Sequence, residues 1–540
     1  MKRLPEGSLG LVVVIAFVAL AALLPVALLF TKAVAGVGGW AGVASVLRAS
    51  ANVRSLENSL LQGGLSAAAA VVVGYPAGVF VGRYDWPGRA WVRSLLLIPF
   101  LLPSLIVVLG VLDLFGPAGL LTGVAGLAWF GSGIPAIVAA NLFFNVPIVI
   151  LLTAAGCETA SVELEETVAT LGGSPARAYR DVWAAPTAVG AAAGGLLTFL
   201  FSALSFAPPL LLCGAGSRCY TLEAQVYALA QTYLAPNAAA VLALGMVAVL
   251  AVPTAAYLVL VSRLRSQPGR RRPTARPLPR RPSWTWALAA ETGGVLAAEA
   301  LLLAAVLYRT LAPEGGRGAG AAWTQLFSPS TTAHLGVSAV GALGNTLFFA
   351  VVAALLALLL GIGSGYAIAR RPRRAIALGL LLFVPLLLSP VVLAFALSSF
   401  YRPLDAAGSV WILVIVSQAI LALPFALQSL EIPLAGLSPA GRDAARALGA
   451  GPWTAFLDAD LPRVRDGLVT VGLFAFAFGL GEFTATNFLV PPALTTLPVA
   501  LYALTSVRLF PVADAAAGLL LLLSLAVFAT IAVGGRRVEL

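Results

Sequence analysis

Long apolar blocks without a charged residue are the feature that most limits what this 540-residue chain can fold into. Residues 9–30, for example, contain no Asp, Glu, Lys or Arg. A helix of about 20 apolar residues spans the hydrocarbon core of a bilayer. Charged residues make up only 10% of the chain, whereas soluble domains carry roughly 25%. The sequence therefore predicts an all-α, polytopic membrane protein.

About twelve transmembrane helices are predicted, six in each half of the chain. In the first half they are residues 9–31, 57–82, 93–115, 134–155, 187–213 and 238–262. In the second half they are residues 285–308, 343–369, 375–400, 410–432, 465–490 and 511–533. The first of these runs is longer than the apolar core of a signal peptide, which is about 7–15 residues. We therefore expect it to remain as an uncleaved span.

Arginine supplies nearly all of the formal charge of +11, since Lys2 and Lys32 are the only lysines. With the N-terminus inside, arginines gather in the inner loops, and the outer loop at 116–133 has neither Lys nor Arg. This is the positive-inside bias, and it predicts that both termini are cytoplasmic. The inner-loop and tail arginines are Arg83, Arg89, Arg93, Arg177, Arg180, Arg370, Arg371, Arg373, Arg374, Arg442, Arg446, Arg463, Arg465, Arg536 and Arg537. The charge thus needs no nucleic acid as a partner.

A linker at residues 263–283 separates the two halves. It holds eight arginines with interleaved prolines, a composition that does not form a packed helix. It is either a solvated cytoplasmic tether, which we favour, or a patch that binds nucleic acid or lipid. The predicted domains are residues 1–262 and 284–540, two six-span halves joined by this linker.

One polar motif is written twice, once in each half. An acidic residue is followed six residues later by glycine and three further on by proline. In the first copy these residues are Glu166, Gly172 and Pro175, and in the second they are Asp443, Gly449 and Pro452. Glycine tolerates the left-handed conformation that ends a helix, and proline suits the first turn of the next one. Each copy therefore predicts a short helix, a turn and a second short helix in a cytoplasmic loop.

The ends of these helix pairs are marked by caps and prolines. Ser161 is the expected N-cap of the first copy, and Pro186 is expected to close it. Ser438 and Pro439 are expected to start the second copy, and residues 461–462 to close it. An interfacial helix pair lying on lipid headgroups is the plainer alternative, but two copies with the same turn make it less favoured.

The duplication extends beyond this motif. The dipeptide Asn58-Ser59 opens one predicted span, and Asn345-Thr346 opens its counterpart. Residues 221–227 align with residues 496–502. Because six spans return the chain to its starting side, the halves form a parallel repeat about an axis along the membrane normal.

The repeated motif resembles the EAA motif of ABC-importer permeases, in particular the fused two-half permeases of the thiamine and ferric-iron group. Residues 204–206, 221–223, 481–483 and 495–498 are similar to signatures of that group. The resemblance implies a type I importer fold in a bacterial inner membrane. It implies two partners besides lipid, a cytoplasmic ATPase dimer and an external solute-binding protein. The residues that it assigns to ATPase coupling are Glu166, Gly172, Pro175, Pro186, Asp443, Ala444, Ala445, Gly449, Pro452, Leu461 and Pro462.

Enzymatic chemistry has little support in the sequence. A phosphate-binding loop needs a Gly-Lys pair, which two isolated lysines do not provide, so ATP hydrolysis is expected in a separate chain. We expect no catalytic residue, metal site or cofactor, and the substrate-binding residues stay unassigned. A gradient-driven secondary transporter with two six-span halves is the alternative function.

Several polar residues fall within or beside the predicted spans. Asp113, Glu291, Glu299 and Glu482 are candidates for a transport role, although such carboxyl groups are more often neutral or paired. Asn141 and Asn145 share one helix face and favour hydrogen bonding between helices. Cys213 and Cys219 flank a predicted outer loop, either as a disulfide or as two free thiols.

Overall fold

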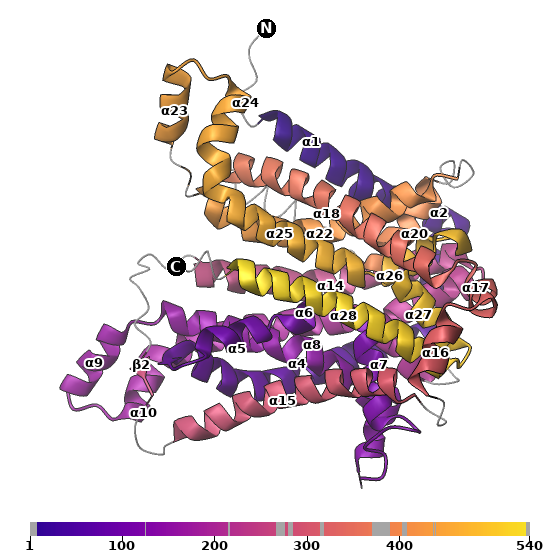
Figure 1. Cartoon of the computed structure of the whole chain (residues 1–540), viewed down its shortest axis with the longest axis horizontal. Coiled ribbons are helices and arrows are strands. Elements are labelled where there is room, and N and C mark those ends of the chain that lie inside the picture. The colour runs from indigo at the N-terminus through magenta and orange to yellow at the C-terminus, as the bar shows by residue number, and fades with distance from the viewer. Residues whose placement is uncertain are drawn as a thin grey trace. The chain divides into compact units, whose positions relative to one another are not determined.

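The computed structural model describes residues 8–124, 126–213, 217–265, 276–278, 284–313, 318–369, 389–401, 408–435, 437 and 439–535. Helices dominate these ranges, as Figure 1 shows, and confirm the predicted all-α class. Within them the only strands are β1 (Tyr84–Asp85) and β2 (Arg276–Pro277), a parallel pair of two residues each. Most of the linker at 263–283 lies outside the described residues.

The chain divides into two compact units, which we name after the copy of the repeated motif that each contains. The first-copy unit comprises residues 40–100 and 104–316. Its elements are α3 (Trp40–Arg48), α4 (Ser50–Arg83), β1, α5 (Arg89–Leu95), most of α6 (Ile98–Leu101), α7 (Ser104–Phe115), η2 (Leu127–Gly131), α8 (Gly133–Thr159), α9 (Val162–Thr170), α10 (Pro175–Ala178), η3 (Tyr179–Trp183), α11 (Ala184–Ala203), α12 (Ala207–Leu212), η4 (Ser217–Cys219), α13 (Leu222–Tyr227), η5 (Ala228–Thr232), α14 (Pro236–Arg265), β2 and α15 (Trp284–Leu311).

The second-copy unit comprises residues 1–39, 101–103 and 317–540. Its elements are α1 (Ser8–Val18), η1 (Ala19–Leu23), α2 (Leu24–Gly36), α16 (Ala319–Leu326), α17 (Pro329–Leu335), α18 (Ala339–Ala369), α20 (Pro390–Phe400), α22 (Val410–Ala435), α23 (Pro439–Ala447), α24 (Pro452–Ala455), η7 (Phe456–Asp460), α25 (Leu461–Gly481), α26 (Thr484–Leu489), η8 (Pro492–Leu494), α27 (Leu497–Ser506) and α28 (Phe510–Gly535).

The first helix of each predicted half packs in the compact unit that contains most of the other half. The run α1–η1–α2 contacts α18 and α20, and α15 contacts α4 and α7. Glycine permits the first of these contacts, because a Cβ on Gly10 would lie 3.3 Å from the Cα of Gly363. The packed units therefore differ from the contiguous ranges 1–262 and 284–540. As a division of the duplicated sequence, those ranges stay a prediction.

Ten helices of the described residues are long and apolar enough to span a membrane. They are Gly10–Gly36, Ser50–Arg83, Gly133–Thr159, Pro175–Ala203, Pro236–Ser262, Thr285–Leu311, Ala339–Gly365, Val410–Leu427, Phe456–Gly481 and Phe510–Ile531. Two of the twelve predicted spans are not among them. The span at 93–115 is broken into α5, α6 and α7, with Pro103 between the last two. Much of the span at 375–400 lies outside the described residues, which resume at Ser389 and α20.

The predicted spans at 187–213 and 465–490 have wrong boundaries. In the structure α10, η3 and α11 form one unbroken helix, Pro175–Ala203, and α24, η7 and α25 likewise run on from Pro452 to Gly481. Pro186 and Pro462 therefore do not close the helix pairs. A π-helical turn lies shortly before each proline: η3 ends at Trp183, three residues before Pro186, and η7 ends at Asp460, two residues before Pro462. Each turn shifts the hydrogen-bond register close to the place where the proline lacks an N–H. Both long helices then end early, at Ala203 and Gly481.

Close helix approach organises the first-copy unit. On α4, a Cβ added at Gly78 would lie 2.5 Å from the Cβ of Thr153 on α8, and one at Gly74 would lie 2.8 Å from the Cβ of Val149. Glycines spaced four apart share one helix face and let two backbones meet, as in membrane helix pairs generally. Val149 and Ile150 belong to the buried core formed there.

Hydrogen bonds between helices, predicted for Asn141 and Asn145, are confirmed. The Asn141 amide on α8 donates to the Oε1 of Gln62 on α4 at 2.7 Å. The Asn145 amide donates to the Oγ of Ser202 on α11 at 3.3 Å and to the Asn141 carbonyl at 2.7 Å. All four side chains are buried, so these bonds join three apolar helices through polar groups that have no access to water.

Candidate functional site

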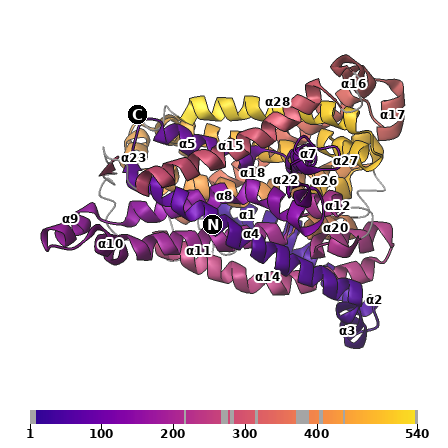
Figure 2. The same ribbon diagram turned by 90° about the horizontal axis from the view of Figure 1, so that it is seen from below.

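The two copies of the repeated motif form two helical hairpins, here called the first hairpin (residues 161–186) and the second hairpin (residues 439–462). In Figures 1 and 2 the helices α9 and α10 project beyond the ends of α4 and α8 in the first-copy unit. Figure 1 shows α23 and α24 in a similar place at one end of α25 in the second-copy unit. Ser438 lies outside the described residues, and α23 begins at Pro439.

The first helix of the first hairpin begins as its sequence predicts. The Ser161 hydroxyl accepts a hydrogen bond from the Leu164 amide at 3.3 Å, which satisfies one of the unpaired N–H groups at a helix start. Glu163 and Glu165 lie in the first turn, where the helix dipole favours negative charge. The helix ends at Thr170, just before the predicted turn.

The turns of the two hairpins match bond for bond. Gly172 has φ +78° and Gly449 has φ +88°, a left-handed conformation that glycine adopts without strain. In the first hairpin the Gly173 amide bonds to the Val168 carbonyl at 2.9 Å. In the second the Ala450 amide bonds to the Ala445 carbonyl at 3.0 Å. This six-to-one bond is the Schellman motif, so the turn predicted from the glycines is present in both copies.

The second helix of each hairpin starts at its proline. The Ser174 hydroxyl caps the first by accepting from the Arg177 amide at 3.3 Å. In the second hairpin Gly451 stands at the corresponding position and has no side chain to serve as a cap. The backbone bond is nevertheless shared, since the Ala178 amide donates to the Ser174 carbonyl and the Ala455 amide to the Gly451 carbonyl.

A buried ion pair fastens the first hairpin to the membrane helices. Glu165 is only 4% exposed, and its Oε1 pairs with the guanidinium of Arg83 at the end of α4. Its Oε2 accepts a hydrogen bond from the indole of Trp183 at 2.8 Å. The Arg83 guanidinium also lies 5.0 Å from the centre of the Trp183 ring. Sequence reasoning missed Glu165 as a site residue and chose its neighbour Glu166, whose side chain is exposed.

The second hairpin has an anchor at the same two positions but with different chemistry. Arg442 corresponds to Glu165, because each directly precedes the acidic residue of its motif. Asp460 corresponds to Trp183, because each lies eleven residues after the turn glycine. The Arg442 Nε lies 3.1 Å from the Oδ2 of Asp460, whose side chain is fully buried. The two hairpins are thus held at equivalent points by a carboxylate in one copy and by a guanidinium in the other.

A second basic cluster closes the end of α4. Arg89 donates from Nε to the Val81 carbonyl at 2.8 Å and from Nη2 to the Gly82 carbonyl at 3.1 Å, where α4 leaves carbonyl groups unpaired. Burial, and then the neighbouring positive charge of Arg93, lower the pKa of Arg89.

The tips of both hairpins expose a leucine. Leu171 is 82% exposed and Leu448 is 89% exposed, and each directly precedes its turn glycine. No atom lies within 4 Å of a Cβ built on either Gly172 or Gly449. A single exposed leucine is ordinary on a protein surface, but the same side chain at both tips makes the tips candidates for binding a protein or a membrane.

The other residues assigned to coupling lie along the same hairpins. Five of them are exposed and three are partly buried, while the side chain of Pro452 is not described. The exposed ones are Glu166, Pro175, Asp443, Ala444 and Pro462, and the partly buried ones are Pro186, Ala445 and Leu461. A cavity of about 760 Å³ lies between the first hairpin and the end of α4, and its lining includes Tyr75, Tyr179 and Ser174.

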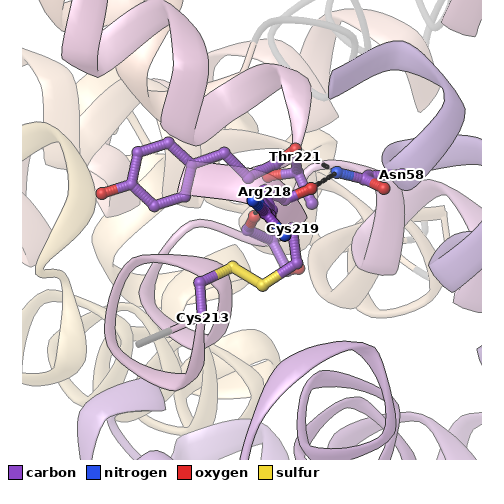
Figure 3. The surroundings of a disulfide bond; sticks show 7 residues. Asn58, Cys213, Arg218, Cys219 and Thr221 are labelled. Atoms are coloured by element: carbon purple, nitrogen blue, oxygen red, sulfur yellow. Dashed lines mark hydrogen bonds between the residues drawn. A yellow bond between two sulfur atoms is a disulfide. The ribbon is translucent and has the colours of Figure 1, made fainter. Parts of the chain in front are cut away.

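The remaining sequence candidates fall elsewhere. Glu482 caps α26 by accepting from the Ala485 amide at 2.7 Å, which is a structural role. Glu299 is buried on α15 and Asp113 on α7, while Glu291 is partly exposed. Cys213 and Cys219 form a disulfide, which settles the question that the sequence left open (Figure 3). Within the described ranges no three His, Cys, Asp or Glu residues are grouped so that they could hold a metal ion.

Comparison with known proteins finds a family that resembles part of the chain. Residues 74–266 match the family described as binding-protein-dependent transport system inner membrane component. This stretch includes the first hairpin and most of the helices that hold it. The family has the type I importer permease fold, in agreement with the predicted fold class.

Three curated relatives resemble shorter stretches. A 2-aminoethylphosphonate transport system permease protein of Salmonella paratyphi A is 33% identical over 103 residues, which is 19% of this chain and 38% of the relative. A thiamine transport system permease protein of Brucella suis is 32% identical over 153 residues, 26% of this chain and 27% of the relative. A molybdenum transport system permease protein of Escherichia coli is 34% identical over 97 residues, 17% of this chain and 42% of the relative. The chain therefore matches less than half the length of each.

Proposed function

We propose that this chain, a member of the family of inner membrane components of binding-protein-dependent transport systems, is the permease of an ATP-driven importer of small solutes. The observation that carries the proposal is the pair of hairpins. Both have the same left-handed glycine, the same Schellman bond and an exposed leucine at the tip. Two tips with matching geometry indicate two equivalent docking points.

Each hairpin is built to move as a rigid body with one membrane helix. The helix that follows each turn continues without interruption into a span, Pro175–Ala203 in one copy and from Pro452 to Gly481 in the other. The Trp183–Glu165 hydrogen bond in the first copy and the buried Arg442–Asp460 pair in the second then tie the preceding helix to the same body. A push on either tip is therefore carried into the membrane helix rather than lost in a flexible loop.

The motor in this proposal is a separate ATPase dimer that docks on both hairpins. The sequence offers no phosphate-binding loop, because Lys2 and Lys32 are its only lysines. An external solute-binding protein delivers the cargo at the opposite face. We place the chain in a bacterial inner membrane with both termini in the cytoplasm, as its arginine distribution favours. The halves 1–262 and 284–540 each supply one hairpin.

The cargo is proposed only as a class. The three relatives are named for 2-aminoethylphosphonate, thiamine and molybdenum transport, so the shared property is a small polar solute. Thiamine and ferric iron are the first two that we would test. The thiamine permease is the relative with the longest matched stretch among the three, 153 residues.

Co-purification tests the docking step. The variant Leu171→Glu/Leu448→Glu places a charge on both tips without touching either anchor. We expect it to lose the ATPase subunit that the wild type retains on an affinity column. Leu311→Glu is the matched control, since Leu311 is also highly exposed (71%) but lies at the end of α15. Equal retention of the ATPase by the tip variant and the wild type would show that the tips are not docking sites.

Transport energetics separate this proposal from the gradient-driven alternative. Vesicles containing the chain, its ATPase and the external solute-binding protein are expected to take up thiamine or ferric iron only when ATP is supplied. Uptake that continues without ATP but stops when the proton gradient is collapsed would instead identify a secondary transporter.

A further inference from the structure

Two short helices interrupt the path of the chain after each long span that follows a hairpin. In the first-copy unit α11 gives way to α12, a short loop and α13. In the second-copy unit α25 gives way to α26, a loop and α27. Figures 1 and 2 both place α26 and α27 at the end of their unit far from α23, and Figure 2 places α12 far from α9 and α10. Within each unit, the loop therefore lies at the end opposite to that unit's hairpin.

A clamp of three hydrogen bonds holds the first loop against α4. The amide nitrogen of Asn58 donates to the Arg218 carbonyl at 2.9 Å and to the Tyr220 carbonyl at 3.0 Å. The hydroxyl of Ser59 accepts from the Leu222 amide at 2.8 Å. Figure 3 shows Asn58 reaching toward the loop beside the Cys213–Cys219 disulfide.

The second loop is held by the same three bonds. The amide nitrogen of Asn345 on α18 donates to the Thr495 carbonyl at 3.1 Å and to the Ala493 carbonyl at 3.4 Å. The hydroxyl of Thr346 accepts from the Leu497 amide at 2.8 Å. In both units the asparagine side-chain amide thus bridges two carbonyl groups that are two residues apart. The hydroxyl of the residue after the asparagine accepts a hydrogen bond from the first N–H of a helix.

These bonds are difficult to replace. Ser59 and Thr346 are each only 2% exposed, so water has little access to their hydroxyl groups. The N–H groups of Leu222 and Leu497 open α13 and α27, where no intrahelical acceptor exists. Without the hydroxyl, each would be a donor without a partner in a buried place.

Each loop also carries a covalent restraint, and the two restraints differ. The first loop is closed by the Cys213–Cys219 disulfide. The second has Pro491 and Pro492 near its start, and the two proline rings fix two φ angles. A disulfide and a pair of proline rings are chemically unrelated. Each nevertheless reduces the number of backbone conformations that its loop can adopt.

We propose that the two clamps, Asn58-Ser59 and Asn345-Thr346, are positioning elements that keep the extracytoplasmic end of the resting permease sealed. The inference rests on the proposed function, because it takes the face opposite to the hairpins to be external. Each clamp joins the loop that follows a hairpin-driven span to the start of a different span. It is therefore one of the points at which a moving helix is fastened to its neighbour.

Leakage through the full-length chain in proteoliposomes tests the seal without a known cargo or ATPase. The probe is iodide, followed by quenching of an entrapped halide-sensitive dye. Asn58→Ala/Asn345→Ala removes both bridging amides and with them two partly exposed hydrogen bonds in each unit. We expect iodide entry to rise about tenfold, as lost hydrogen bonds of about 1 kcal/mol each would produce. Asn58→Asp/Asn345→Asp keeps the side-chain shape but not the donor, and the same rise is expected.

The two copies supply their own control. The exchange Ser59→Thr/Thr346→Ser keeps a hydroxyl at each position and is expected to leak no more than the wild type. Ser59→Ala/Thr346→Val removes both hydroxyls and is expected to leak like the alanine pair. Wild-type leakage in the Asp pair and in the variant without hydroxyls, each eluting as a single species, would overturn the clamp.

The result is also separable from the docking proposal. Clamp variants are expected to retain the ATPase on the affinity column while they leak. The tip variant Leu171→Glu/Leu448→Glu is expected to lose the ATPase without leaking. Failure of the tip variant to release the ATPase would count against docking alone, whereas an iodide-tight clamp pair would count against the seal alone.

Discussion

At the scale of single residues, the anchors show how a polar hairpin is held to an apolar body. Glu165 reaches Arg83 across 82 residues of sequence and also receives the Trp183 indole. A buried charge that loses its partner costs several kcal/mol, whereas a well-made pair contributes little net stability. The anchor therefore fixes where the hairpin lies more than it stabilises the fold.

Removing the Glu165 carboxylate tests this anchor. We expect Glu165→Ala to lower stability by about 3–5 kcal/mol, because the Arg83 guanidinium is left buried without its partner. The freed hairpin should then be cut faster by trypsin at Arg177 and Arg180, whose side chains are already 66% and 74% exposed. Glu166→Ala, at the exposed neighbouring position, is the control and should be cut at the wild-type rate. Equal cutting of both variants would contradict the anchor.

Gly172 and Gly449 are expected to respond to backbone strain alone. A Cβ at either position meets no atom within 4 Å, so only the positive φ opposes a side chain. A left-handed conformation costs about 1–2 kcal/mol for ordinary residues and less for asparagine. We expect Asn at both positions to retain the ATPase and Val to lose it, as measured by co-purification. Retention of the ATPase by the valine pair would show that the turn geometry is not needed for docking.

At the scale of elements, the π-helical turns explain why each hairpin runs into a span. Sequence rules expect a helix to stop near Pro186 and Pro462, because proline lacks the N–H of a regular helix. The turns η3 and η7 absorb that defect, and the helix continues. Proline spacing alone does not reveal such a turn, whereas the turn glycines and the Ser161 cap follow local rules and were predicted.

The α4–α8 contact provides a matched pair of glycine substitutions. Gly78→Ala would place a Cβ 2.5 Å from that of Thr153, and we expect a loss of about 1–3 kcal/mol from overpacking. Gly64 lies on the same helix with nothing within 4 Å of its Cβ. Gly64→Ala should therefore raise stability by up to about 1 kcal/mol, the helix propensity difference. Thermal unfolding in detergent measures both, and a shift of the same sign for both would refute the close approach.

At the scale of the whole molecule, the sequence predicted the all-α class, the duplication and the position of both hairpins. It did not predict the anchors, since the partners of Glu165 and Arg442 depend on contacts between distant segments. It also did not predict that α1 and α15 pack away from their own halves, because an evenly apolar helix carries no mark of its neighbours. Local sequence rules thus predict turns and helix caps, whereas the anchors and the placement of α1 and α15 depend on tertiary packing.

Topology is tested with single cysteines, because the native Cys157 is buried and the other two are paired. Leu171→Cys and Leu448→Cys are expected to react with a membrane-impermeant maleimide only in inside-out vesicles. Leu311→Cys, at the far end of its helix, is expected to react only in intact cells. Labelling of either hairpin tip from outside would end the importer proposal.

The placement of α1–α2 and α15 has a consequence for how the protein is made. The second-copy unit includes residues translated first, and the first-copy unit waits for α15, which is translated after the linker. Neither unit is complete when a ribosome has finished residues 1–262. The early helices must therefore stay in the lipid with their packing faces uncovered until the later segments are made. A gene divided at the linker would yield working protein only when both fragments are produced together.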